Sequence, residues 1–341
     1  MDRVLISAAM LMEVETVLQT QEPVIKPAWN TFASSVSGIW KGVGAVFSPI
    51  TAEMEPVETG SRNENLYDCY TLTCVEAVFP PSRKNFEIHR KINWVTLNPH
   101  GEVPEHGVTL GNKEEPRVKK ATSPLKEKSN AGMTNHVLPK FGSFDLTTSD
   151  VMEEDVMGNE PGLVFFEDGS YSRGPLDIPV GDIDDSNYYL SPTFKFEQCL
   201  VKGSHKRLRI VHTIEFGNGG SDVQIMRVAI YEEEWVCPAH IHDKSLNADL
   251  EFDLTPFSQR KRTRPSELVG PWKDVTVLWL PGGVTSYVDV SNDGILTIGV
   301  GWYSNEGINL VMERDYGING KLKEVRWKSE VKRRWADPMP L

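Results

Sequence analysis

Short runs rich in Val, Ile, Phe, Tyr and Trp, interrupted by Gly, Asn and Asp, dominate the chain from Ile39 onward. β-Branched and aromatic residues pack well on a pleated surface, and the interrupting residues form tight turns. Two hairpins are predicted, over residues 208–231 and 308–335, because each of these segments has a turn containing Asn-Gly between two apolar runs. The pattern therefore predicts a mainly β, antiparallel fold.

The composition is that of a globular protein that carries excess negative charge. The 341 residues suggest about two domains. Lys and Arg number 36 against 48 Asp and Glu, for a net charge of −12, which disfavours nucleic acid as a partner. The four cysteines show no repeated C-x-x-C pairs, so we expect a reducing compartment and no disulfide scaffold.

Residues 1–26 are expected to form an N-terminal helix and a linker. The apolar stretch at residues 4–12 is about half of the roughly 20 residues that a membrane span needs. Asp2, Glu13 and Glu15 also disfavour a signal peptide or an intact transit peptide. No transmembrane segment is predicted.

The remaining chain divides into two predicted β units, at residues 27–258 and 259–341. The first contains a polar excursion at about residues 98–160. The basic linker near Arg260 is expected to have no partner, and the run Glu232-Glu233-Glu234 is expected to be solvated. A short internal repeat supports two related units, because Gly38-Ile39-Trp40-Lys41 resembles Gly270-Pro271-Trp272-Lys273.

Several segments resemble an uncharacterised calycin-like family, a domain of unknown function found in cyanobacteria and plants. They include WNTF…SGIWKG, LVFFEDGSYSRG, LRIVHTIEF, ELVGPWK and GVGWYSNEGINLVMERDYGINGKLKEVRWKSE. The resemblance implies two lipocalin-like barrels in tandem, with Trp40 and Trp272 as structural plugs and an Arg from a late strand stacked on the Trp ring. It also implies a chloroplast location, with the cytoplasm as the alternative because no intact transit peptide is visible.

The second unit departs from this pattern because only five strands fit after Trp272. A closed barrel of about eight strands needs more chain. The fold class expected is therefore a calycin-like antiparallel barrel followed by a shortened second unit. An open sheet exposes edges, so this unit should either dock on the first barrel or be less stable and prone to self-association.

No catalytic constellation emerges from the sequence. There is no G-x-S-x-G elbow, no P-loop and no G-x-G-x-x-G between a strand and a helix. A bilin-lyase activity is the only enzymatic hypothesis; it rests on the calycin resemblance alone, and none of the motif residues of that family are present. Cys237, His240 and His242 lack a fourth ligand, so no metal site is predicted.

Arg314 and Tyr316 would share one face of a strand and point toward an apolar interior. Arg314 could stack on Trp272 as a structural residue, or hold a ligand carboxylate as a similar Arg-x-Tyr does in fatty-acid-binding proteins. His212 could be a hydrogen-bonded core residue or a haem ligand. The candidate ligand-binding residues are Arg314, Tyr316, Trp302 and His212.

The sequence leads to two hypotheses about function. The first is non-catalytic binding of a hydrophobic or amphipathic small molecule, a lipid or a tetrapyrrole, inside the first barrel. The alternative is a scaffold or assembly factor whose barrel is filled with side chains and whose loops contact protein partners. Eight-stranded barrels of both kinds exist, so barrel size does not separate the two.

Overall fold

The structure is a computed structural model that describes residues 28–58, 65–81, 85–98, 150–180, 191–203, 205–239, 254–262, 277–303 and 308–331. One helix, α1 (Trp29–Val36), precedes the strands. The first group of strands is β1 (Gly38–Phe47), β2 (Met54–Glu55), β3 (Val57–Glu58), β4 (Asn65–Leu66), β5 (Asp68–Val78), β6 (Glu87–Asn98), β7 (Asp150–Met157), β8 (Leu163–Phe165), β9 (Tyr171–Arg173), β10 (Thr193–Lys202), β11 (Lys206–Gly217) and β12 (Asp222–Cys237). The second group is β13 (Val277–Leu280), β14 (Val284–Val290), β15 (Leu296–Tyr303), β16 (Ile308–Tyr316) and β17 (Leu322–Val331).

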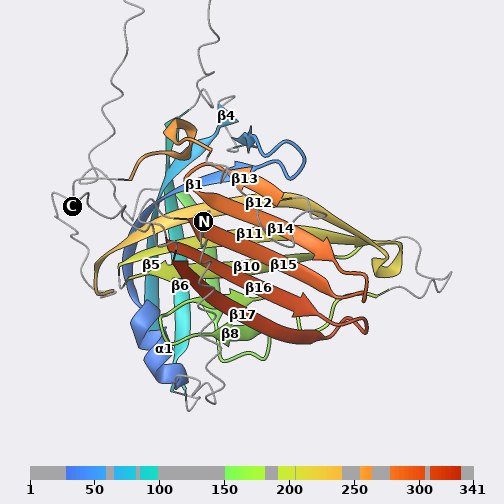
Figure 1. The fold of residues 1–341 in the computed structure, drawn as a ribbon. Helices are drawn as coiled ribbons and strands as arrows, with labels where there is room; N and C mark the ends of the chain where they lie inside the picture. The colour runs from blue at the N-terminus through green and yellow to red at the C-terminus, as the bar shows by residue number, and fades with distance from the viewer. Residues whose placement is uncertain are drawn as a thin grey trace, which may run out of the picture.

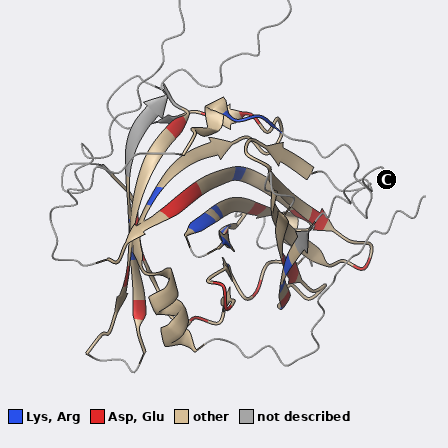
Figure 2. Ribbon diagram, turned by 60° about the vertical axis from the view of Figure 1, so that its left-hand side comes forward, with Lys and Arg blue, Asp and Glu red and all other residues tan. Residues whose placement is uncertain are grey.

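The first group forms a large antiparallel sheet, sheet 1, with the order β7-β6-β5-β1-β12-β11-β10-β9-β8, and β2 pairs with β1. The sheet curls strongly (Figure 2). Arg90 on β6 contacts Glu197 on β10, although β5, β1, β12 and β11 lie between these two strands in the sheet. β7 and β8 are edge strands, so the described part of sheet 1 is a half-barrel rather than the closed barrel that the sequence predicted.

The two faces of sheet 1 bury different residues, because alternate side chains of a strand point to opposite sides. Trp40, Arg209 and Glu197 lie on the concave face, since each pairs with residues of that face on the neighbouring strands. Ile210, Val228 and Val43 lie on the outer face. In an isolated barrel the outer face would meet water, but here these three residues are completely buried.

The second group forms sheet 2, a five-stranded meander in the order β13-β14-β15-β16-β17, which confirms the five strands expected after Trp272. Sheet 2 covers the outer face of sheet 1 (Figure 1), and Val300, Trp302 and Met312 share one core with β1, β11 and β12. The shortened unit is therefore docked on the first, which is one of the two outcomes expected. Docking buries one face of each sheet against the other.

Helix α1 packs at one end of the concave face. It buries Trp29, Phe32 and Val36 in a cluster that also contains Trp40. Gly38 links the helix to β1 with a φ of 146°, and a Cβ atom there would lie 2.1 Å from Trp235 Nε1. Only glycine therefore fits at this junction.

One predicted boundary needs correction, and several other predictions concern residues that the structure does not describe. Residues 150–157 were assigned to the polar excursion, but they form β7, because Met157 and the partly buried Glu153 and Asp155 face the barrel interior. The expected N-terminal helix within residues 1–26, most of the excursion and Trp272 lie outside the described residues. In the described part of the chain, no helix combines the length and apolarity required to cross a membrane.

Candidate functional site

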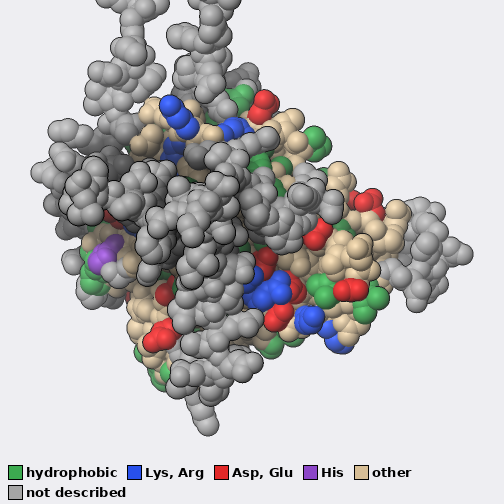
Figure 3. Space-filling view, in the orientation of Figure 1, with side chains coloured by type: hydrophobic (Ala, Val, Ile, Leu, Met, Phe, Trp, Pro, Cys, Tyr) green, Lys and Arg blue, Asp and Glu red, His purple; other side chains and the backbone are tan. Residues whose placement is uncertain are grey.

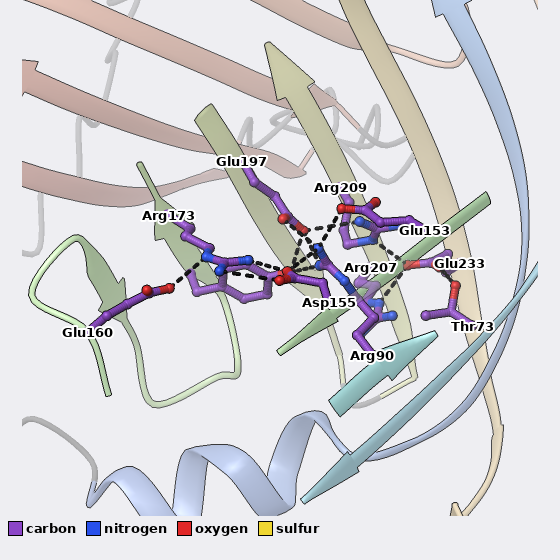
Figure 4. A network of polar contacts seen from close by, with 11 residues as sticks. Thr73, Arg90, Glu153, Asp155, Glu160, Arg173, Glu197, Arg207, Arg209 and Glu233 are labelled. Carbon is purple, nitrogen blue, oxygen red and sulfur yellow. Dashed lines mark hydrogen bonds and ion pairs between the residues drawn. The ribbon is translucent and has the colours of Figure 1, made fainter. Parts of the chain in front are cut away.

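A network of buried charges lies in the middle of the concave face (Figure 4). Arg90 donates two hydrogen bonds to Glu197, with N–O distances of 2.5 and 3.0 Å. Arg209 joins the two acids, donating from Nη1 to Glu197 at 3.1 Å and from Nε to Glu233 at 3.0 Å. Arg207 Nε donates to the same Glu233 oxygen at 2.8 Å. Four strands, β6, β10, β11 and β12, thus meet through five side chains.

The two carboxylates of this network are held in the charged state. Burial alone raises the pKa of Glu233, but Arg207 and Arg209 outweigh it and lower the pKa to about 2. Burial likewise opposes ionisation of Glu197, and Arg90 and Arg209 hold its pKa well below the ordinary value. A buried ion network of this kind stabilises one geometry, because removing any single partner leaves an unpaired buried charge.

Trp40 is connected to this network by Arg207. The guanidinium of Arg207 lies 3.9 Å from the centre of the Trp40 ring, and the indole Nε1 donates to the carbonyl of Val36 in α1. The calycin resemblance implies such an arginine on a plug tryptophan, and β11 supplies it here. A cavity of about 30 Å³, large enough for a water, lies beside this pair and is also lined by Asp168 and Ser35.

Beyond the network, away from α1, the concave face is only partly buried, and its apolar side chains are bordered by Lys195 and by the pair of Arg227 and Glu55. Tyr231 forms the boundary, because its ring covers Arg209 at 4.7 Å and its hydroxyl donates to Met152 Sδ at 3.3 Å. Gly44 makes room for this ring, since a Cβ atom there would lie 2.7 Å from it. The half-buried residues past Tyr231, here called the inner patch, are Val46, Val211, Thr213 and Ala229.

Along β11, the side chains on the outer face are more buried than those on the concave face. Ile210, His212 and Ile214 on the outer face are completely buried under sheet 2, whereas Val211 and Thr213 on the concave face are only half-buried. Usually the interior of a barrel is its most buried region. In this chain, the docked second sheet reverses that order at this end of β11.

The candidate binding residues lie in a different place from the inner patch. His212, Trp302, Arg314 and Tyr316 are all on the layer between the two sheets. His212 Nε2 lies 2.6 Å from Ser286 Oγ on β14, and burial lowers its pKa to about 4. Trp302 is 7% exposed within the shared core. The structure brings Arg314 and Tyr316 together, but His212 and Trp302 contact neither of them through a hydrogen bond.

Arg314 is occupied by partners from its own chain. Its Nε donates to Tyr316 at 2.7 Å, and its Nη2 donates to the carbonyls of Gly162, Gly174 and Pro175 at 3.1, 3.1 and 2.9 Å. These carbonyls belong to the segments that flank β8 and β9, so Arg314 fastens sheet 2 to the edge of sheet 1. The geometry supports the structural role that the sequence left open, although the expected partner Trp272 lies outside the described residues.

One expectation about a charged segment was wrong. Glu233 was expected to be solvated but is completely buried, because it alone of the run at residues 232–234 faces Arg207 and Arg209. Within the chain, Arg260 of the basic linker forms an ion pair with Glu232 and stacks on Phe257, and the expectation that this linker has no binding partner stays a prediction. Sequence reasoning also missed Arg90, Arg207, Arg209 and Glu197.

A signal for the missed arginines was present in the sequence. Arg207 and Arg209 alternate with Leu208 and Ile210, so the two sides of one strand differ in polarity. No comparable signal marks their partners, because Glu197 and Arg90 are separated by 107 residues.

Within the described residues, no group of three or more His, Cys, Asp and Glu side chains could hold a metal ion, and His240 and His242 lie outside them.

The curled sheet, its charge network and the inner patch define a mainly β protein built on a half-barrel. No protein-family model and no curated protein matches the chain. Among solved structures, it is similar to a protein of unknown function from the DUF3598 family of Nostoc punctiforme, with 16% identity and a TM-score of 0.46 over 89% of this chain and 98% of the other. It is also similar to a candidate AttH protein of Nitrosomonas europaea, with 10% identity and a TM-score of 0.17 over 85% of this chain and 67% of the other. At these values neither likeness carries an argument about function.

Proposed function

We propose that this protein binds a hydrophobic or amphipathic small molecule on the concave face of sheet 1, at the inner patch. The observation that carries the proposal is the reversed burial along β11, where Val211 is half-buried while its outer-face neighbours are fully buried. Apolar side chains left partly open on the inner side of a curled sheet suit an apolar ligand.

The charge network fixes the position of Tyr231 at the edge of the proposed site. Arg209 lies beneath the ring of Tyr231 and is itself held by Glu197 and Glu233. Tyr231 is only 9% exposed and its hydroxyl is bonded to Met152, so it forms a rigid aromatic edge of the inner-patch surface, with little rotamer freedom to lose on binding. A planar tetrapyrrole or the chain of a lipid would both use such a surface.

The calycin-like assignment is part of the same proposal. The stacking of Arg207 on Trp40 supports it, as does the position of Trp40 beside the leading helix α1. A chloroplast location rests on the sequence resemblance alone. A ligand role for Arg314, Tyr316, Trp302 and His212 would need a binding place between the sheets, and the occupied donors of Arg314 favour the inner patch instead.

Native mass spectrometry with oleate and with protoporphyrin tests the proposal. Ala229→Trp places a large side chain on the inner patch and should abolish binding, while melting confirms that the variant folds. Val290→Trp is the matched control, because Val290 is 57% exposed at the end of β14 in sheet 2, and this variant should bind like the wild type. Equal binding by the two variants would place the ligand elsewhere.

The scaffold alternative has one observation in its favour. The half of the concave face next to α1 is filled by aromatic side chains and by the charge network, with Phe32, Tyr171 and Arg90 each at most 2% exposed. If the wild-type protein binds neither oleate nor protoporphyrin, the filled-barrel alternative becomes the better description.

Figure 3 shows acidic and basic side chains side by side on the visible described surface, which does not indicate a partner of one charge sign.

A further inference from the structure

The two Asn-Gly dipeptides of the chain lie in different hydrogen-bonding environments. Asn218-Gly219 forms the turn between β11 and β12, and Asn319-Gly320 forms the turn between β16 and β17. Asn-Gly suits both turns because each contains a glycine with positive φ, 66° at Gly219 and 72° at Gly320. The same dipeptide is also the least hindered in a known side reaction of asparagine, since glycine has no side chain to obstruct attack by its nitrogen.

In the turn between β16 and β17, the groups that would react are occupied. Asn319 Oδ1 accepts a hydrogen bond from Lys321 N at 3.2 Å, and Gly320 N donates to Gly317 O at 2.8 Å. Gly320 is also buried, with the carbonyl oxygen of Ile178 only 2.2 Å from the position of an added Cβ atom. Attack by the Gly320 nitrogen therefore requires its hydrogen bond to Gly317 to break and the buried glycine to move.

The turn at Asn218 lacks this protection. Asn218 and Gly219 are both exposed, whereas Gly320 in the other turn is buried. The side-chain amide of Asn218 makes no hydrogen bond to another described residue, because the contacts of this residue use its backbone carbonyl, which accepts from Ser221. Asn218 also has a φ of 49°, in the left-handed region that asparagine adopts more readily than most residues.

We propose that Asn218 is a site of spontaneous deamidation in the folded protein and that Asn319 is protected. The deprotonated nitrogen of Gly219 attacks the Asn218 side-chain carbonyl carbon, a C–N bond forms, and ammonia leaves. Water then opens the resulting succinimide at either carbonyl, which gives aspartate or isoaspartate. The sum of the steps is hydrolysis of one amide, so water is the only co-reactant.

The product changes the hairpin that carries the charge network. Aspartate at position 218 adds a negative charge four residues from Asp222, and isoaspartate also inserts one methylene group into the main chain. The neighbouring Gly220 packs tightly against the carbonyl of Pro179, whose oxygen lies 2.1 Å from the position of an added Cβ atom. The turn therefore has little room for a longer backbone.

Peptide mapping by mass spectrometry of the aged, folded wild-type chain tests the proposal. Since the attacking nitrogen of Gly320 is buried and hydrogen-bonded, we expect deamidation at Asn218 to be faster by about tenfold or more. In urea the two dipeptides should react at similar rates, which is the internal control for the effect of the fold. Asn218→Ser should remove the faster-forming product. Equal rates in the folded protein, or a faster reaction at Asn319, would overturn the proposal.

Discussion

The charged residues of the concave face are buried because they satisfy one another. Arg209 is 0% exposed and is compensated by Glu197, Glu233 and the ring of Tyr231. Isolated, such a charge could not enter the interior, since its desolvation would cost several kcal/mol or more, on the order of the whole stability of a domain. Each member of the network thus depends on strands that are remote in sequence.

Trp40→Ala should destabilise the protein by about 3–5 kcal/mol, because it leaves a large cavity beside α1 and removes the ring on which Arg207 stacks. Urea unfolding measures the loss. Phe79→Ala is the control, since Phe79 is 55% exposed and its removal should change stability by only about 0.5 kcal/mol. Wild-type stability of the Trp40 variant would contradict the plug role.

Arg314→Lys should destabilise the protein by about 2–4 kcal/mol with or without ligand. A lysine keeps the charge but cannot reach Tyr316 and the carbonyls of Gly174 and Pro175 together. Arg326→Lys is the control, because Arg326 has a side chain that is 39% exposed. Normal melting of the Arg314 variant with weakened oleate binding would restore the ligand-anchoring role.

At the scale of elements, the polar contacts between the sheets fix how they dock. Gln198 on β10 donates to the carbonyls of Ile298 and Met312 on sheet 2, and His212 on β11 meets Ser286 on β14. The surrounding layer is apolar, so it would tolerate several relative positions of the sheets. A few directional bonds in such a layer favour one of them.

His212 makes the docking of the sheets sensitive to acid. The unfolded chain takes up a proton on this residue near the ordinary pKa of 6.5, whereas the folded protein does so only near 4. Between these values the unfolded state binds more protons, so stability falls as the pH is lowered. From pH 7 to about pH 5 this residue should contribute a loss of about 2 kcal/mol.

Urea unfolding of the wild type and of His212→Gln at both pH values isolates this contribution. The difference between the two pH values should shrink by about 2 kcal/mol in the variant, because glutamine does not titrate in this range. The acids of the network titrate in both proteins and cancel in the comparison. An unchanged pH dependence would show that His212 is not the group responsible.

At the scale of the whole molecule, side chains rather than backbone pairs join the two edges of sheet 1. Arg173 on β9 forms ion pairs with Asp155 on β7 and with Glu160 after it, the latter at 2.7 Å. Arg90 also reaches Asp155, at 3.3 Å. These contacts cross the gap between the edge regions and hold the curl that creates the concave face.

Arg173→Gln should therefore loosen the curl, with a loss of about 1 kcal/mol and faster hydrogen exchange in β7. The effect should diminish at high salt, since the pairs are partly exposed and salt screens them. Lys321→Gln is the control, because its pair with Asp177 is 68% and 65% exposed and should contribute nothing measurable. Unchanged exchange in β7 would mean that the curl is held without Arg173.

The sequence by itself determined the positions of several strands and turns, although it placed β7 in the polar excursion. The five strands after Trp272 and the turns at Asn218-Gly219 and Asn319-Gly320 were predicted correctly, because strand periodicity and turn chemistry act over a few residues. Trp40, for which the family resemblance implied a buried position, is 3% exposed.

Only the tertiary structure decided which charges are buried and where an accessible apolar surface remains. Glu232, Glu233 and Glu234 are identical in sequence type, yet Glu233 alone is completely buried, because β11 presents Arg207 and Arg209 to its side of the strand. The inner patch at Val211 likewise depends on sheet 2 covering the opposite face. Both outcomes depend on pairings between segments far apart in the chain, and no local pattern encodes these.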